Sequence, residues 1–298
     1  MKLAATLIAV VTATALAAAQ GQSSAPTQPA QESKPTQPTG RPPIQAKTPA
    51  EFQAYQAAIA NGSNPEALEK ASDDFATKFP DSDVRVLLYR ACMNSYQAAG
   101  KSDKMMDMGL KILGIDKDDP EALIVVSEVL QEHTSPTDLD RDQRANQAVA
   151  YAQHALETID TDLAVPVGSP PDKVEAYKRY LRSTALATIG TVQYKREQYQ
   201  DAEGNLRKAI EADAGNPDAV VILRLALALD QEKKYAEALQ QANRAVELTK
   251  EDTDVGKMAR NERDRLVIET NGNNGNNGNA APAAAPAPPP QNPAPPSH

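Results

Sequence analysis

The pattern of apolar and polar positions in the second half of the chain repeats with a fixed period. Within each copy, the apolar residues recur at intervals of three and four, which is the spacing of one face of an α-helix. The period is 36 residues, and a period of this length predicts a stack of helix pairs, each burying its apolar face on the next. The two copies, 36 residues apart, are Tyr199-x-x-Ala202-x-x-x-Leu206-x-x-Ala209 and Tyr235-x-x-Ala238-x-x-x-Ala242-x-x-Ala245.

Each of these helices is preceded by another helix with a matching face. Residues 219–229 carry an apolar stripe that includes Ala226, and residues 173–195 form a long helix that ends after Gly190 and Tyr194. A glycine in a helix interior is about 1 kcal/mol less favourable than alanine. Close contact with Ala202 is a physical reason to keep Gly190, because small side chains let two helix axes approach. Residues 195–198 and 231–234 are the expected turns.

The first half of the chain carries weaker copies of the same organisation. Asn64-Pro65-Glu66 and Asp119-Pro120-Glu121 each place a capping residue, a proline and an acid in the order that begins a helix. We expect helices over 52–60, 65–78, 85–99, 102–113, 121–132 and 146–159, with a long insertion at 133–145 and an irregular break at 160–172. Residues 251–270 have few apolar positions and are expected to form a terminal cap helix.

These residues resemble the tetratricopeptide repeat family, which has a small residue in the first helix, a tyrosine and an alanine early in the second, and a large–small pair farther on. The matching residues are Gly190, Tyr199, Ala202, Leu206 and Ala209 in one repeat, and Ala226, Tyr235, Ala238 and Ala245 in the next. Ala242 stands where the family usually has a larger residue, and the proline expected after the second helix is displaced to Pro217. The resemblance implies an all-α, right-handed solenoid of antiparallel helix pairs with about five repeats, and no cofactor.

The two ends of the chain differ from its middle. Residues 1–19 have one lysine, an uncharged stretch and a small-residue site, which indicates a signal peptide, with an uncleaved anchor as the alternative. Residues 20–50 (rich in Pro and Gln) and 271–298 (Asn-Gly, then Ala-Pro) are expected to be disordered, because they have little apolar surface to bury. A spacer is the expected role of the proline-rich parts, and a docking motif is the alternative.

The expected organisation is therefore a signal peptide over 1–19, a linker over 20–50, degenerate repeats over 51–160, an irregular connection over 161–172, repeats and a cap helix over 173–270, and a low-complexity tail over 271–298. The signal predicts an exported protein, in the periplasm or, alternatively, outside the cell. No membrane span is expected once the signal is removed, because the apolar run at 219–229 is interrupted by Arg224.

Charge limits the kinds of partner. Residues 51–270 contain 27 Lys and Arg against 39 Asp and Glu, together with all the aromatic residues. Nucleic acids and anionic membranes are recognised by basic surfaces. The acidic middle of the chain therefore predicts no nucleic-acid partner.

Candidate chemistry is sparse. Asp138, Asp140 and Asp142 begin like a calcium loop, but Gln143 replaces the required glycine and the terminal glutamate is absent, so a helix start is the expected role. The histidines, His133, His154 and His298, have no metal-ligand spacing. The single cysteine, Cys92, lies among apolar residues at helical spacing, so we expect a buried thiol rather than a reactive one.

Arg90 and Asn94 lie one helical turn apart. They resemble half of the carboxylate clamp with which some tetratricopeptide proteins bind a C-terminus. The next repeat should contribute a further Lys, Arg or Asn, but residues 122–126 there are apolar. A clamp is therefore not expected.

These observations predict a non-catalytic scaffold of the cell envelope that binds a protein or peptide of unknown identity. The alternative is an accessory helical subunit of an envelope enzyme or of a polysaccharide-handling complex. In the family, first helices line the inner surface, so the resemblance implies a partner surface there. Its residues are Thr191, Tyr194, Lys195, Leu223, Leu227, Asp230 and Gln231. Packing of the two leucines on the adjoining helices is the competing interpretation.

Overall fold

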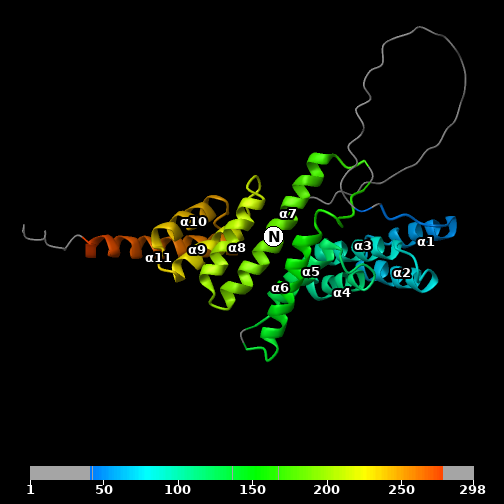
Figure 1. Ribbon diagram of the computed structural model, residues 1–298, viewed down its shortest axis with the longest axis horizontal. Helices are drawn as coiled ribbons and strands as arrows, with labels where there is room; N and C mark the ends of the chain where they lie inside the picture. The colour runs from blue at the N-terminus through cyan, green and yellow to red at the C-terminus, as the bar shows by residue number, and fades with distance from the viewer. Residues whose placement is uncertain (1–40, 42, 136, 167, 278–298) are drawn as a thin grey trace, which may run out of the picture. The chain divides into compact units, whose positions relative to one another are not determined.

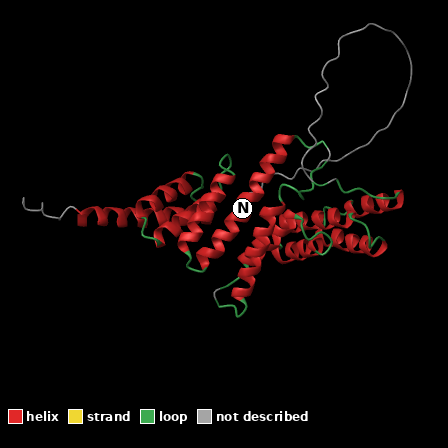
Figure 2. Cartoon of the chain, viewed as in Figure 1, coloured by secondary structure: helices red, strands yellow, loops and turns green. Residues whose placement is uncertain are grey.

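The computed structural model describes residues 41, 43–135, 137–166 and 168–277, with side chains through residue 271. Over these residues the chain forms helices joined by turns, plus one isolated β-bridge (Figures 1 and 2). The predicted all-α class of consecutive helix pairs is confirmed. The helices divide into two compact units, residues 1–189 and 190–298, and the division falls inside helix α7 (Pro171–Lys195).

The first unit contains three helix pairs and most of α7. The pairs are α1 (Pro49–Ile59) with α2 (Pro65–Lys78), α3 (Val84–Ala98) with α4 (Ser102–Leu113), and α5 (Pro120–Glu132) with α6 (Arg141–Thr158). The Asn64 and Asp119 side chains accept hydrogen bonds from the N–H groups of Ala67 (3.0 Å) and Ala122 (2.9 Å). These two residues are therefore the N-caps of α2 and α5, as the sequence predicts.

The core of the first unit lies between successive pairs. Two large buried side chains of α3 belong to different clusters: Tyr96 packs with Leu68 of α2 and Ile112 of α4, and Leu88 packs with Phe75 of α2. Between α5 and α6 the packing is tighter, because α6 presents a stripe of fully buried alanines, Ala148, Ala152 and Ala155. A stripe of small residues lets the two helix axes come close.

The second unit contains the end of α7, then α8 (Tyr199–Ala212), α9 (Ala219–Gln231), α10 (Tyr235–Glu247) and the long α11 (Asp254–Asn277). All the small residues of the repeated pattern on α8 and α10 are 0% exposed: Ala202, Ala209, Ala238, Ala242 and Ala245. A Cβ atom added to Gly190 would lie 2.8 Å from Cγ of Leu206, so the crossing of α7 and α8 depends on a glycine.

The turns inside three of the pairs, α3 with α4, α7 with α8 and α9 with α10, share one backbone form. Gly100, Glu197 and Lys233 have φ values of 66°, 62° and 62°, and the last two lie 36 residues apart. After each of them, an N–H donates back to a carbonyl five residues earlier, as from Lys234 to Leu229 (2.9 Å). This left-handed termination is the Schellman form of helix ending. In these three pairs, it brings the second helix back beside the first.

The ends of the repeat array are more ordered than the sequence suggests. Residues 43–48, which we call the strap, belong to the segment assigned to a disordered linker, yet Ile44 and Ala46 pack on the core and α1 begins at Pro49. The side chain of Glu51 accepts from the backbone N–H groups of Lys47 (2.6 Å) and Thr48, which fixes the strap to α1.

The other boundaries move for local reasons. Helix α11 continues to Asn277, past the expected tail start at 271, because adding residues to an existing helix is far easier than starting one. Helix α6 begins at Arg141, earlier than expected, supported by the Asp140–Arg144 pair at 2.7 Å. The expected signal peptide lies outside the described residues. Among the described helices, none has both the length and the apolar character needed to cross a membrane.

Candidate protein-binding surface

The two predicted contact leucines of the second unit are covered. Leu223 is 4% exposed and belongs to a cluster with Ile222, Ala245 of α10 and Ala259 of α11. Leu227 is half-buried against the same cluster. Leu223 therefore packs on adjoining helices, as the competing interpretation has it, and α11 is one of the helices that cover it.

Helix α11 also engages the polar residues of the predicted surface. Arg265 of α11 forms ion pairs with Asp230 of α9 (2.5 Å) and with Glu262 (2.9 Å). The two carboxylates raise the pKa of Arg265, chiefly through hydrogen bonds. Tyr194 lies edge-on to Tyr199 with ring centroids 5.6 Å apart, and burial raises its pKa. These groups serve the packing of the last helices.

The remaining predicted residues separate into buried and exposed positions. Thr191 is 3% exposed, whereas Lys195 and Gln231 are exposed, and the amide of Gln231 reaches Asp230 at 3.4 Å. The structure thus gathers Tyr194, Asp230 and Gln231 near one edge of the second unit. It removes Thr191 and Leu223 from solvent. Sequence reasoning missed this cover because α11 was expected only as a cap of low apolar content.

A hollow that sequence reasoning did not identify lies on the first helices of the first unit. Its volume is about 470 Å³, and it is bounded by the strap, by Phe52 and Tyr55 of α1, and by Val84 and Leu87 of α3. Phe52 is 49% exposed, a large apolar side chain that the described residues leave half in solvent. An aromatic-lined hollow of this kind is typical of a place where a partner inserts a side chain. The spacing of Phe52 and Tyr55 could have suggested it, but the strap wall could not have been foreseen.

Arg90, the candidate clamp residue, is engaged by carboxylates of the same chain. Its guanidinium pairs with Asp119, and its Nε lies 2.6 Å from the carboxylate of Glu121. Tyr177 of α7 donates to Glu121 at 2.5 Å. Burial raises the pKa of Asp119 although Arg90 lies beside it. Internal carboxylates therefore occupy the cation that a foreign carboxylate would need.

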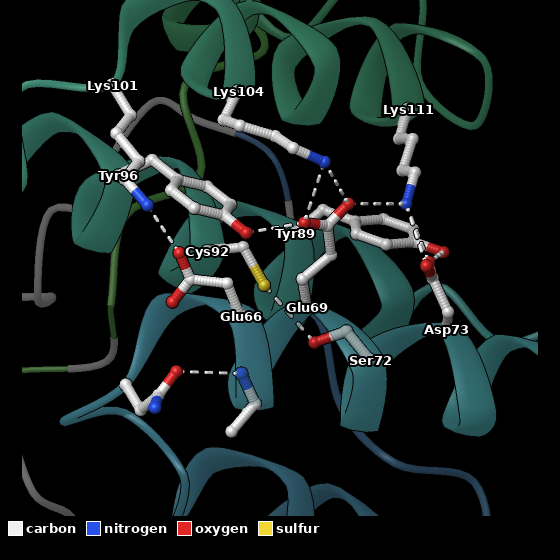
Figure 3. Close-up of polar contacts among 12 residues, drawn as sticks. Glu66, Glu69, Ser72, Asp73, Tyr89, Cys92, Tyr96, Lys101, Lys104 and Lys111 are labelled. Carbon is white, nitrogen blue, oxygen red and sulfur yellow. Dashed lines mark hydrogen bonds and ion pairs between the residues drawn. The ribbon is translucent and has the colours of Figure 1, made fainter.

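A second polar cluster joins α2, α3 and α4 (Figure 3). Glu69 accepts from Tyr96 (2.5 Å) and Lys104 (3.2 Å), and Asp73 accepts from Tyr89 (3.0 Å) and Lys111 (2.7 Å). The second unit has an equivalent: Glu203, like Glu69 the fifth residue of its helix, pairs with Lys234 at 2.6 Å. These contacts tie the second helices of successive pairs together.

Cys92 lies beneath this cluster and is fully buried. Its sulfur is 3.3 Å from Oγ of Ser72, and burial raises the pKa of the thiol. A thiol of raised pKa carries little thiolate at neutral pH and is a poor nucleophile. Cys92 is thus a core residue, as the sequence predicts.

The acidic and histidine candidates have ordinary partners. Asp138 accepts from the N–H of Ser135 (2.8 Å), His133 Nδ1 lies 3.0 Å from Asp103, and His154 Nε2 lies 2.8 Å from Asp118. In the part of the chain that the structure describes, no group of three or more His, Cys, Asp or Glu side chains is placed to hold a metal ion. His298 lies outside that part.

Comparison with known proteins adds structural likenesses but no sequence relative. No protein-family model matches the chain, and no curated protein matches its sequence. Solved structures with similar folds include MamA (14% identity, 66% of this chain and 92% of that chain, TM-score 0.46). A thermophilic TPR protein of Thermus thermophilus (14%, 74% and 98%, 0.42) and PilW, a type IV pilus biogenesis factor (16%, 78% and 96%, 0.46), are also similar. In fold, the chain is an all-α array of helix pairs that resembles the tetratricopeptide repeat proteins.

Proposed function

We propose that this protein is a non-catalytic scaffold of the cell envelope that binds a protein or peptide on its first helices. The observation that carries the proposal is the hollow between α1, α3 and the strap, with Phe52 half-exposed at its edge. Aromatic side chains seated in or around such hollows contribute much of the binding energy in protein interfaces. An extended peptide with one apolar side chain fits this chemistry.

The second unit has a candidate surface of its own, separate from the hollow. Lys195 and Gln231 are exposed and Tyr194 is half-buried beside them. Leu223 does not contribute, because α11 covers it, and Leu227 contributes only its exposed part. The envelope location rests on the signal-like residues 1–19.

Selection of peptides from a random displayed library on the intact protein tests the binding role. We expect selected peptides to lose affinity for Phe52→Ser and to keep it for Leu110→Ser. Leu110 of α4 is a matched control, because it is 43% exposed and lies outside the lining of the hollow. Circular dichroism should show equal helix content in both variants.

Two results would refute the proposal. One is a failure to select any peptide from the library. The other is selection of peptides that bind Phe52→Ser and Leu110→Ser equally well, which would place binding elsewhere. The signal peptide has its own test, since a chain recovered from cells with Met1 still present would contradict its cleavage.

A further inference from the structure

The strap wall of the hollow presents main-chain groups that pair with no backbone group in the part of the chain that the structure describes. Its residues alternate between exposed and half-buried positions from Pro43 to Lys47, as in a strand with one face on the protein. Among the described residues, the backbone N–H and C=O groups of Gln45 and Ala46 take part in no backbone hydrogen bond. The hollow therefore offers aromatic rings and a free extended edge side by side, which suits an extended peptide.

The segment that leads into the strap contains a repeated tetrapeptide. Pro-Thr-Gln-Pro occurs at Pro26–Pro29 and again at Pro35–Pro38. In a polyproline helix, residues three apart lie on the same edge. Both prolines of such a tetrapeptide would then face one surface, while the Thr and Gln between them keep their N–H groups for pairing. Both copies lie outside the described residues.

We propose that Pro26–Pro29 of the same chain bind in the hollow, with the two prolines against Phe52 and Tyr55, so that the protein carries its own competing ligand. The inference rests on the proposed use of the hollow as a peptide site. Proline-rich ligands suit aromatic-lined grooves because they lose little conformational entropy on binding. The segment has no charge between residues 20 and 31, in keeping with an apolar hollow.

Chain length selects the farther copy. Arg41 is anchored by its bridge to Ala164 and by an ion pair with Asp116, so the reach of the preceding residues is counted from this point. Pro38 of the nearer copy is only three residues before Arg41, and a flexible segment of that length spans roughly 10 Å on average, which reaches only the near end of the lining. Pro29 is twelve residues before Arg41, and a flexible segment of that length spans roughly 20 Å on average. The lining residues 44–49 lie within about 10–26 Å of Arg41 along the chain.

Tethering makes weak binding effective. A short flexible linker gives an effective concentration of the order of 1 mM. An intrinsic Kd of about 0.1 mM would then fill the hollow about nine-tenths of the time and weaken an outside peptide about tenfold. The strength of self-binding thus sets how strongly a partner must compete.

The test adds the full chain, in steps up to a concentration of the order of 1 mM, to a trace of fluorescein-labelled peptide of residues 24–33 and follows binding by anisotropy. We expect Pro26→Ala/Pro29→Ala to bind the peptide up to about tenfold more tightly than the unaltered chain, because its own segment no longer competes. The matched control, Pro35→Ala/Pro38→Ala, carries the same change in the nearer copy and should bind like the unaltered chain. Adding Phe52→Ser to the first variant should abolish binding, and Phe52→Gln serves if Phe52→Ser unfolds.

Several results would overturn the inference. They are no peptide binding at millimolar concentration, equal binding by the unaltered chain and Pro26→Ala/Pro29→Ala, or a gain in the control variant instead. A gain that disappears on dilution would show that the segment comes from a second copy, which also contradicts binding within one chain. If peptides selected from the library still need Phe52 for binding, the proposed function stands even when binding of the chain's own segment has been refuted. Failure of the inference and failure of the proposed function can therefore be told apart.

Discussion

The crossing of α7 and α8 gives the sharpest test of the fold, through two glycines in the same unit. Gly190 faces α8, and a Cβ atom there would lie 2.8 Å from Cγ of Leu206 and 3.3 Å from the carbonyl oxygen of Ala202. Gly204 lies within α8, and a Cβ atom there would meet nothing within 4 Å. Substituting alanine at each position adds the same methyl group to a helix interior.

The two substitutions should change stability in opposite directions. Replacing a helical glycine by alanine stabilises by about 1 kcal/mol, so Gly204→Ala should gain about that amount. At Gly190 the same gain is opposed by overpacking, which typically destabilises by about 1–3 kcal/mol. Gly190→Ala should therefore lose about 1 kcal/mol net, and the two variants should differ by about 2 kcal/mol.

Thermal unfolding followed by circular dichroism at a helical wavelength measures this difference. For a unit of this size, 1 kcal/mol corresponds to a shift of roughly 4–8 °C in Tm. Helix propensity cancels between the two variants, so the difference reports the contacts of the added methyl group with Leu206 and Ala202 of α8. An increase in Tm for Gly190→Ala equal to that for Gly204→Ala would show that the helices do not approach as the structure has them.

Three further substitutions test other parts of the structure. Leu223→Gln should destabilise by about 2 kcal/mol or more, because it leaves a polar group in the cluster under α11; an unchanged Tm would contradict that cover. Lys233→Gly should be neutral or stabilising by up to about 1 kcal/mol, since glycine adopts the left-handed conformation freely. Gly100→Lys should destabilise, because lysine adopts that conformation at a cost. Equal changes in Tm for the two variants would be inconsistent with the turn geometry. Hydrogen bonding and charge from Arg182 and Lys178 lower the pKa of Asp160. A carboxyl whose pKa is lower in the folded state contributes stability above its unfolded pKa of about 3.9 and loses it as pH falls through the folded pKa. The Tm advantage over Asp160→Asn should therefore be present at pH 6 and decline below pH 4, and an advantage independent of pH would refute the assignment.

Much of the helical array follows from the sequence because its signals are local. A capping residue, a proline and an acid at Asn64 and Asp119 specify where a helix begins, whatever packs on it later. The alanine stripes of α6, α8 and α10 specify which face is buried, since side chains three and four apart share a face. Gly109 was missed: a Cβ atom there would lie 2.9 Å from Val126, yet no tyrosine or alanine pattern marks this crossing.

The candidate surfaces were harder to predict because they depend on segments that return from elsewhere in the chain. The hollow needs the strap as a wall, and the strap is held by Glu51 of α1 together with packing of Ile44 on two parts of the core. Ile44 is the only branched aliphatic residue among residues 20–50, and a single such residue does not predict an ordered segment. A buried glutamate that fixes the preceding backbone is a capping device, and its effect on the path of the chain appears only in three dimensions.

Helix α11 shows how one charged position can conceal a helix face. Its residues Ala259, Glu262 and Leu266 are all at most 9% exposed, and they follow the spacing of a single face. In the sequence, Glu262 is a charged residue in the middle of this stripe, so the pattern does not look like an apolar face. Its burial is stabilised by the ion pair with Arg265, which also pairs with Asp230 of α9. The same pairing draws α11 over Leu223. The residue that hid the face in the sequence is therefore part of the contact that covers the predicted partner surface, and the free aromatic hollow lies in the first unit instead.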